Sequence, residues 1–211
     1  MNKKILITGT GGFSKEVLCL ITDLGKYDDV LGFIEPDNIF SEMDSKNIMG
    51  KPILPYSILN TDDHIVSIAI GDSKIREKIV SELPINTEYI TLVHPSAIIS
   101  KWVEIGEGSI ICAGTIITGD IEIGKHSHFN LNTTIGHDCI IGDYFTSAPN
   151  VNISGNCKFE KHVYFGTSSC IKQGLEICQN VTIGMGAIVT KSINVSGVYI
   201  GNPAKLINKN K

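Results

Sequence analysis

The fold of this chain is decided between Ile99 and Val189, where every sixth residue belongs to one nearly unbroken apolar series. Its members are Ile99, Ile105, Ile111, Ile117, Ile123, Phe129, Ile135, Ile141, Ser147, Ile153, Phe159, Phe165, Ile171, Ile177, Ile183 and Val189. A period of six fits neither a helix nor a single strand, but it is typical of a parallel β-helix built from hexapeptide repeats. Three repeats make one triangular coil of roughly 18 residues, so the series predicts about five stacked coils.

Small residues accompany the series and favour the same fold. Two positions before each member stands a small or aliphatic residue, as at Ala97, Ser109, Thr133, Cys139 and Cys157, and glycine often follows a member directly. We expect the series to fill the interior, the small residues to lie where the wall bends, and glycine to occupy corners. A β-sandwich would instead show turns every 8–12 residues or so and loops of irregular length.

Composition excludes several classes of function. The 211 residues carry a formal net charge of −4 with a pI near 5.8, and no lysine and arginine cluster indicates a nucleic-acid surface. Six cysteines without a CxxC pair predict packed, reduced thiols and no metal site. The start of the chain lacks the apolar core of a signal peptide, and no long apolar run occurs. We therefore expect a cytoplasmic protein without membrane insertion.

The first 94 residues predict a separate α/β domain, and the β-helix domain is expected from 95 to 211 with a C-terminal tail. Strands are expected at 3–8, 30–34 and 65–70, and helices at 15–24 and through positions 75, 79 and 83. Strand, glycine loop and helix in alternation predict a small Rossmann-like parallel sheet. Residues 37–63 are polar and interrupted by proline, which predicts a mobile loop with one short element, and 89–93 predicts a last strand.

A glycine loop, Gly9-Thr10-Gly11-Gly12-Phe13-Ser14, joins the first strand to the first helix. Ser14 stands where a dinucleotide fingerprint has its third glycine, so NAD is disfavoured. The free backbone N–H groups at the start of a helix still favour a phosphate. Glu35, at the end of the second strand, is placed to accept a hydrogen bond from a ribose hydroxyl or a nucleobase. A tight turn that binds nothing is the alternative.

One histidine of the repeat region, His137, has a carboxylate directly after it. The segment Ile135-Gly136-His137-Asp138-Cys139 puts His137 two residues past a member of the series, hence at a corner with its ring outward. An adjacent carboxylate can orient the ring and raise its basicity, so that the histidine acts as a general base. From the residues alone, a solvated turn histidine is the alternative.

Four longer motifs are informative together. They are the segment Asn130-Leu131-Asn132-Thr133-Thr134-Ile135-Gly136-His137-Asp138, the closing Gly201-Asn202-Pro203-Ala204-Lys205, the N-terminal Ile5-Leu6-Ile7-Thr8-Gly9-Thr10-Gly11-Gly12-Phe13, and Ala69-Ile70-Gly71-Asp72-Ser73-Lys74-Ile75-Arg76. The combination resembles the bacterial sugar acyltransferases of the sialic-acid O-acetyltransferase and nucleotide-sugar N-acetyltransferase group, over nearly the whole chain. This resemblance implies a left-handed β-helix, a homotrimer with active sites between subunits, and acetyl-CoA as donor.

The resemblance also implies roles for single residues. His137 matches the catalytic base and Asp138 the acid that enhances its basicity. The residues that match contacts to the nucleotide sugar are Gly11, Gly12, Phe13, Glu35, Gly71 and Asn130. Those that match the acetyl-CoA groove are Thr146, Gly166, Thr167, Gly184, Met185 and Lys205. Gly155 follows His137 by one coil of 18 residues, and its backbone N–H is expected to polarise the thioester carbonyl.

These roles predict an N-acetyltransferase that acts on the 4-amino group of a nucleotide-linked 4-amino-4,6-dideoxyhexose, for a surface glycan such as O-antigen. The nucleotide is expected to be UDP or dTDP, with GDP as a further candidate, because Phe13 stands where relatives with UDP-linked substrates carry histidine. Two alternatives stay open. One is an O-acetyltransferase acting on sialic acid or another free sugar, and the other is a non-catalytic trimeric scaffold.

Overall fold

The computed structural model describes residues 3–207, which form two compact units, one ending at Leu92 and the other beginning at Val93. Residues 1–2 and 208–211 lie outside the described range, and the latter belong to the predicted C-terminal tail. The N-terminal unit contains a five-stranded sheet in the order β3 (Asn47–Ile48), β4 (Lys51–Pro55), β2 (Val30–Glu35), β1 (Lys4–Thr8) and β5 (His64–Ile68). All neighbours pair in parallel except β3 and β4.

Three α-helices and two short 3-10 helices complete the N-terminal unit. The α-helices are α1 (Gly12–Asp23), α2 (Asp37–Glu42) and α3 (Ser73–Glu82), and the 3-10 helices are η1 (Tyr27–Asp29) and η2 (Tyr56–Ile58). Asp72 caps α3, because its side chain accepts hydrogen bonds from the backbone N–H groups of Lys74 and Ile75. By contrast, no side chain caps the start of α1 at Gly11.

Two predictions about this unit were wrong. Residues 37–63 are not a loop, because they contain α2, β3 and β4, and β4 pairs in parallel with β2 through Phe33 and Ile53. Pro52 and Pro55 concealed β4, because proline in a segment normally argues against a strand there. The second error concerns 89–93. Tyr89 makes an isolated bridge to Val66, whereas β6 (Leu92–Val93) belongs to a sheet of the β-helix.

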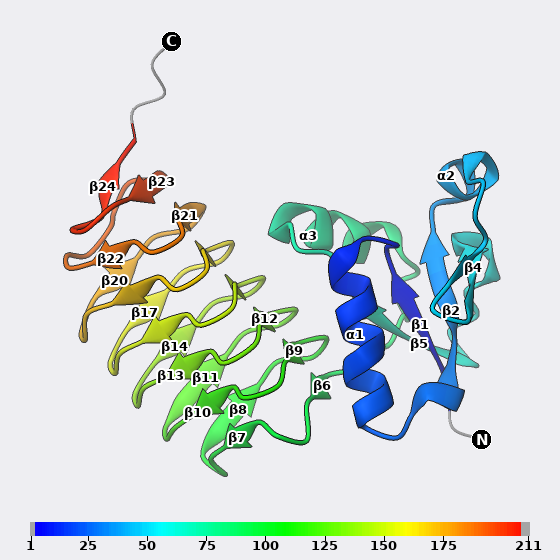
Figure 1. Ribbon diagram of the computed structural model, residues 1–211, viewed down its shortest axis with the longest axis horizontal. Helices are drawn as coiled ribbons and strands as arrows, with labels where there is room; N and C mark the ends of the chain where they lie inside the picture. The colour runs from blue at the N-terminus through cyan, green and yellow to red at the C-terminus, as the bar shows by residue number, and fades with distance from the viewer. Residues whose placement is uncertain (1–2, 208–211) are drawn as a thin grey trace. The chain divides into compact units, whose positions relative to one another are not determined.

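The second unit is a parallel β-helix with three stacked sheets, and its coils repeat along the ribbon from green to orange in Figure 1. Strands 18 residues apart are neighbours, as where Ile116 pairs with Ile98 and with Thr134. The first sheet contains β7 (Ile98–Ile99), β10 (Ile116–Ile117), β13 (Thr134–Ile135), β16 (Asn152–Ile153), β19 (Cys170–Ile171) and β22 (Ile188–Val189). The second contains β8 (Val103–Ile105), β11 (Ile121–Ile123), β14 (Ile140–Ile141), β17 (Lys158–Phe159) and β20 (Glu176–Ile177).

The third sheet is the longest. After β6 it contains β9 (Ile110–Ile111), β12 (His128–Phe129), β15 (Thr146–Ser147), β18 (Tyr164–Phe165), β21 (Val181–Ile183), β23 (Gly197–Ile200) and β24 (Lys205–Leu206). Its last strand, β24, pairs antiparallel with β23. The repeat predicted from the apolar series is therefore confirmed as a β-helix of hexapeptides.

From Gly108 to Gly186, each corner turns on one residue in the left-handed backbone conformation. These residues recur every six positions with φ between 53° and 76°: Gly108, Gly114, Asp120, His126, Asn132, Asp138, Tyr144, Asn150, Asn156, His162, Ser168, Gly174, Asn180 and Gly186. Glycine, asparagine and aspartate adopt this conformation most readily. The turn directs an amide toward the preceding coil, as where Asp138 N–H donates to Gly119 O at 3.1 Å. Strand amides donate the other way, as from Ile116 N–H to Thr133 O at 2.8 Å.

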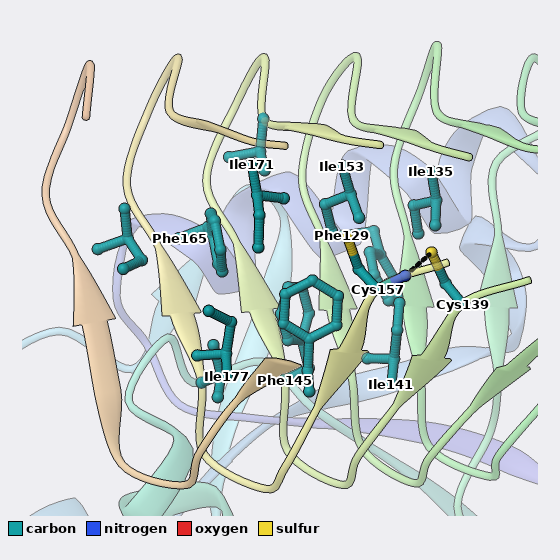
Figure 2. Close-up of a cluster of buried hydrophobic side chains, with 14 of the residues drawn as sticks. Phe129, Ile135, Cys139, Ile141, Phe145, Ile153, Cys157, Phe165, Ile171 and Ile177 are labelled. Atoms are coloured by element: carbon teal, nitrogen blue, oxygen red, sulfur yellow. Dashed lines mark hydrogen bonds between the residues drawn. The ribbon is translucent and has the colours of Figure 1, made fainter. Parts of the chain in front are cut away.

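The apolar series lines the interior, where its aromatic members pack against one another and against Phe145, which stands two positions before Ser147 (Figure 2). Phe145 stacks on Phe129 with ring centroids 5.6 Å apart and meets Phe159 edge-on at 5.3 Å. The polar exception, Ser147, is fully buried, and its hydroxyl pairs with that of Thr133 at 2.9 Å. A hydrogen bond of this kind offsets most of the cost of burying a hydroxyl.

Close stacking of the coils predicts a stability effect at Gly106. A Cβ there would lie 2.6 Å from backbone atoms of Gly124 and Lys125, whereas a Cβ on Gly119 would meet nothing within 4 Å. Gly106→Ala should therefore lower the free energy of unfolding by about 1–3 kcal/mol, because backbone of the next coil must move. Gly119→Ala serves as the control and should change it by less than about 0.5 kcal/mol. Urea denaturation measures both, and equal stabilities would contradict the close-packing argument.

Candidate functional site

His137 and Asp138 lie together on the corner between β13 and β14. His137 Nδ1 and Asp138 Oδ2 are 2.5 Å apart, and both side chains are more than half exposed. The left-handed conformation of Asp138, with φ 59°, accompanies this contact between consecutive side chains. Because one ring nitrogen is bound to the carboxylate, Nε2 is the nitrogen available to a proton on a substrate. This is the arrangement of a histidine general base with an orienting acid.

Gly155, one coil further along, lies directly under the His137 ring. A Cβ on Gly155 would come within 2.7 Å of Nε2 and 2.8 Å of Cε1, so only glycine leaves the ring its place. The next residue, Asn156, donates its backbone N–H to His137 O at 2.6 Å. The sequence led to Gly155 by counting one coil, but the steric reason for glycine there became visible only in the structure.

The other histidines of the central coils have a different environment. His126 and His162 stack on opposite sides of Tyr144, with ring centroids 5.4 Å and 5.3 Å from it, and both are buried. His128 is buried as well. Burial and ring stacking are sufficient reasons for these side chains. Exposure distinguishes His137 from them, since its side chain is more than half exposed.

Asn130 and the residues predicted for the acetyl-CoA groove lie on a different corner or in the adjoining sheet. Asn130 lies on the turn from β12 to β13, and its Oδ1 accepts from Leu131 N–H at 2.7 Å. The equivalent turns of later coils carry Gly166, Thr167, Gly184 and Met185, while Thr146 lies in β15 and Lys205 in β24 of the adjoining sheet. His137 and Gly155 lie instead on the corner at the other end of the first sheet. Within one chain the coils thus bring His137, Asp138 and Gly155 together. They do not bring Asn130 or the residues predicted for the acetyl-CoA groove to that corner.

Two of the predicted glycines on that corner have a structural reason to be there. A Cβ on Gly166 would lie 2.6 Å from Met185 N, and a Cβ on Gly184 would lie 2.6 Å from Ile200 Cγ2. Close stacking alone therefore accounts for both. Thr167 and Met185 are exposed, Met185 to 80%, and Thr146 is buried. An exposed methionine is the strongest apolar feature of this corner.

In the N-terminal unit, the predicted nucleotide contacts gather at one edge of the sheet. Strands β2, β1 and β5 are parallel neighbours, so Glu35, the glycine loop and Gly71 all follow carboxyl ends of adjacent strands. A Cβ on Gly11, Gly12 or Gly71 would meet nothing within 4 Å, which leaves open space above the start of α1. Gly9 differs, because its φ of 86° and the contact with Ile70 require glycine for folding.

Glu35 is already engaged by its neighbours. Its Oε1 accepts a hydrogen bond from the Thr10 hydroxyl at 2.7 Å. Burial, and then the negative charges of Glu35 and Glu82, raise the pKa of Tyr56 well above its usual range, which places Tyr56 near this carboxylate. Phe13 is the second residue of α1, directly after Gly12. Sequence reasoning missed Thr10 and Tyr56 because neither is distinctive outside the folded chain.

A cavity of about 440 Å³ lies beside the glycine loop. It is lined by Thr10 and Lys15 and by six residues from the segment that the sequence had predicted as a loop: Met43, Ser45, Asn47, Ile48, Met49 and Ile53. Lys15 supplies a cation, and the two methionines supply an adaptable apolar wall. No sequence motif indicates this cavity, because its wall depends on how β3 and β4 pack beside the glycine loop.

Two kinds of feature are absent from residues 3–207, a metal site and a membrane-spanning helix. No group of three or more histidine, cysteine, aspartate or glutamate side chains there could hold a metal ion. No helix in that range is long and apolar enough to cross a membrane.

Comparisons with known proteins match both units. Residues 4–83 match the family model of the PglD N-terminal domain, and residues 97–119 and 159–191 match that of the hexapeptide repeat of succinyl-transferase. The chain is 30% identical over 182 residues to GDP-perosamine N-acetyltransferase of Escherichia coli O157:H7. The aligned region covers 80% of this chain and 78% of that protein.

Two solved structures are similar over almost the whole chain. The acetyltransferase domain of PglB from Neisseria gonorrhoeae, in complex with acetyl coenzyme A, is 26% identical with a TM-score of 0.89, covering 98% of this chain and 100% of that one. PerB from Caulobacter crescentus, in complex with CoA and GDP-perosamine, is 25% identical with a TM-score of 0.88, covering 97% of each chain.

The contact between Gly155 and the His137 ring generates a direct test. Gly155→Ala should displace the ring, because the side chain is the part that can move, and should shift its imidazole resonances in a ¹H–¹³C NMR spectrum. Gly119→Ala, one coil before His137 in the same column, should leave these resonances in place because its Cβ meets nothing. Unchanged His137 resonances in Gly155→Ala would show that the ring does not rest on this glycine.

Proposed function

Because this chain belongs to the nucleotide-sugar N-acetyltransferases that join a PglD-type N-terminal domain to hexapeptide repeats, we propose that it acetylates the 4-amino group of a nucleotide-linked 4-amino-4,6-dideoxyhexose. The donor is acetyl-CoA, and the product serves a surface glycan such as O-antigen. The observation that carries the proposal is the exposed His137–Asp138 pair with Nε2 directed over Gly155.

In the reaction, the sugar amine attacks the thioester carbonyl while His137 Nε2 removes a proton from the nitrogen. Asp138 holds the Nδ1–H tautomer and stabilises the imidazolium that forms. The backbone N–H of Gly155 is the nearest candidate to stabilise the oxyanion, since it belongs to the residue under the ring. The carbonyl then reforms, the C–S bond breaks, and the CoA thiolate leaves as the amide is completed.

The N-terminal unit would hold the nucleotide. The backbone N–H groups at Gly11 and Gly12 start an α1 that has no side-chain cap, so they can bind the diphosphate with help from the helix dipole. Lys15, one turn along, adds a positive charge at the edge of the cavity. The cavity beside it, walled by Met43, Asn47 and Met49, is suited to a nucleobase.

The sequence favoured UDP or dTDP, but GDP is now the first nucleotide to test. A relative that matches 80% of the chain is named for GDP-perosamine, which is also a ligand in the similar PerB structure. Asn47 and Ser45 in the cavity wall offer donors and acceptors to the edge of a base.

A homotrimer would complete the site. His137 lies on one corner of its coil, whereas Asn130 and the residues predicted for acetyl-CoA lie on another corner or in the adjoining sheet. One chain alone therefore does not assemble base and donor groove. A second copy with its donor corner against the His137 corner would do so.

The catalytic assignment is tested by a thiol-release assay with acetyl-CoA and GDP-, UDP- and dTDP-linked 4-amino sugars, with sialic acid as a further acceptor. His137→Ala should lower turnover at least about 10²-fold with little change in acetyl-CoA affinity, because a general base is lost. Asp138→Asn should also lower turnover, while Asp120→Asn, at the same corner position one coil earlier, should not. CoA release with sialic acid alone would favour O-acetylation, and normal turnover in His137→Ala would remove this residue from the mechanism.

The nucleotide assignment is tested at the start of α1. Gly12→Val should raise KM for the nucleotide sugar at least about 10-fold, because the side chain fills the space proposed for the diphosphate. The KM for acetyl-CoA should stay the same. Cys19→Val places the same residue at an exposed position of the same helix and is the control. If Gly12→Val keeps both KM values, the diphosphate binds elsewhere.

A further inference from the structure

The corner that carries His137 is tied to the next coil by a sulfur atom. Cys139, two residues after His137, is buried and directs its thiol at Ser154 O, 3.4 Å away on the following coil. The same sulfur accepts a hydrogen bond from Cys157 N–H at 3.5 Å, which is the dashed line in Figure 2. Cys139 thus both donates to and accepts from the coil that contains Gly155.

These two contacts lie on either side of Gly155. Ser154 precedes it by one residue and Cys157 follows it by two, while Asn156 N–H bonds to His137 O between them. His137 and Gly155 are 18 residues apart in the chain, so their spacing depends on links of this kind. Backbone bonds also join these two coils, from Gly136 N–H to Ile153 O at 2.8 Å and from Ile140 N–H to Cys157 O at 3.0 Å. Cys139 adds two side-chain links, one on each side of Gly155.

The donor proton of Cys139 is present under ordinary conditions. A cysteine thiol is mostly protonated near neutral pH, and burial of Cys139 favours the neutral form further. A thiol is a weak donor, so each contact contributes little by itself to global stability. Its effect is geometric, because a small displacement of a catalytic group can lower a rate by one or two orders of magnitude.

The β-helix does not need sulfur at this position in order to fold. Val103, two coils earlier in the same column, occupies the equivalent position without a polar side-chain atom, and Thr115 and Thr133 occupy it at other corners. Ser109 makes the same pair of links far from His137, donating to Gly124 O at 3.2 Å and accepting from Ser127 N–H at 3.2 Å. The link is therefore a local choice at each corner.

We infer that Cys139 is a positioning residue, which fixes the His137 base over the Gly155 backbone by bonding to both flanks of Gly155. This inference rests on the proposed function, because it assigns the spacing of His137 and Gly155 to catalysis. It names no direct contact between Cys139 and a substrate.

The experiment compares Cys139→Val with Cys139→Thr, which have nearly the same shape but differ in a hydrogen-bonding hydroxyl. Cys139→Val should lower kcat about 10-fold with KM for both substrates within about 2-fold, because binding groups are untouched. Cys139→Thr should recover kcat to within about 3-fold of the unchanged protein. Cys139→Ala and Cys139→Ser form a second pair, smaller in volume, which decides the question if a β-branched residue at this position prevents folding.

Ser109→Val is the matched control, since it removes an identical pair of links at a corner away from His137. Its kcat should remain within about 2-fold of the unchanged protein. Equal kcat values within both pairs, or an equal loss in Ser109→Val, would overturn the inference. Failure of the proposed function would give a different result. The protein without substitutions would then release no CoA, or His137→Ala would keep full activity.

Discussion

The hydrogen bond that each left-handed corner residue from His126 to Gly186 donates back to the preceding coil is the constraint on which the β-helix depends. Strand amides donate forward, as from Asn152 to Ser169 O, whereas corner amides donate backward, as from Asn156 to His137 O. Each coil is therefore held from both sides, and three repeats must close in exact phase. The conformation selects asparagine, aspartate and glycine at corners, and where Tyr144 occupies one, its ring stacks between two histidines.

The same constraint gives Asp138 two reasons to be where it is. Aspartate tolerates the left-handed conformation, as Asp120 does one coil earlier with no histidine before it. At 138 the carboxylate also reaches the ring of the preceding residue. A catalytic pair has thus been placed on a turn that would favour an aspartate anyway. Pattern alone could not separate the structural reason from the chemical one, because only the contact with His137 distinguishes the two corners.

The sequence predicted the β-helix well because its signal is local and repeats. One interior residue every six positions identified the fold, and adding one coil to His137 led to Gly155. The N-terminal unit was harder, because its arrangement depends on packing between distant segments. Pro52 and Pro55 concealed β4, and with it the cavity that Met43, Asn47 and Met49 form beside Lys15. Tyr56 near Glu35 is a further consequence of tertiary structure that no motif announces.

The pairing of strands 18 residues apart also limits how the length of this half of the chain can change during evolution. An insertion or deletion of one residue between Ile99 and Val189 would turn every later side chain from the interior to the surface, unless it bulged out at a corner. Gain or loss of a whole coil preserves the phase. A coil inserted between His137 and Gly155 would nevertheless separate the base from the backbone beneath it, so new coils are tolerated only before or after this pair.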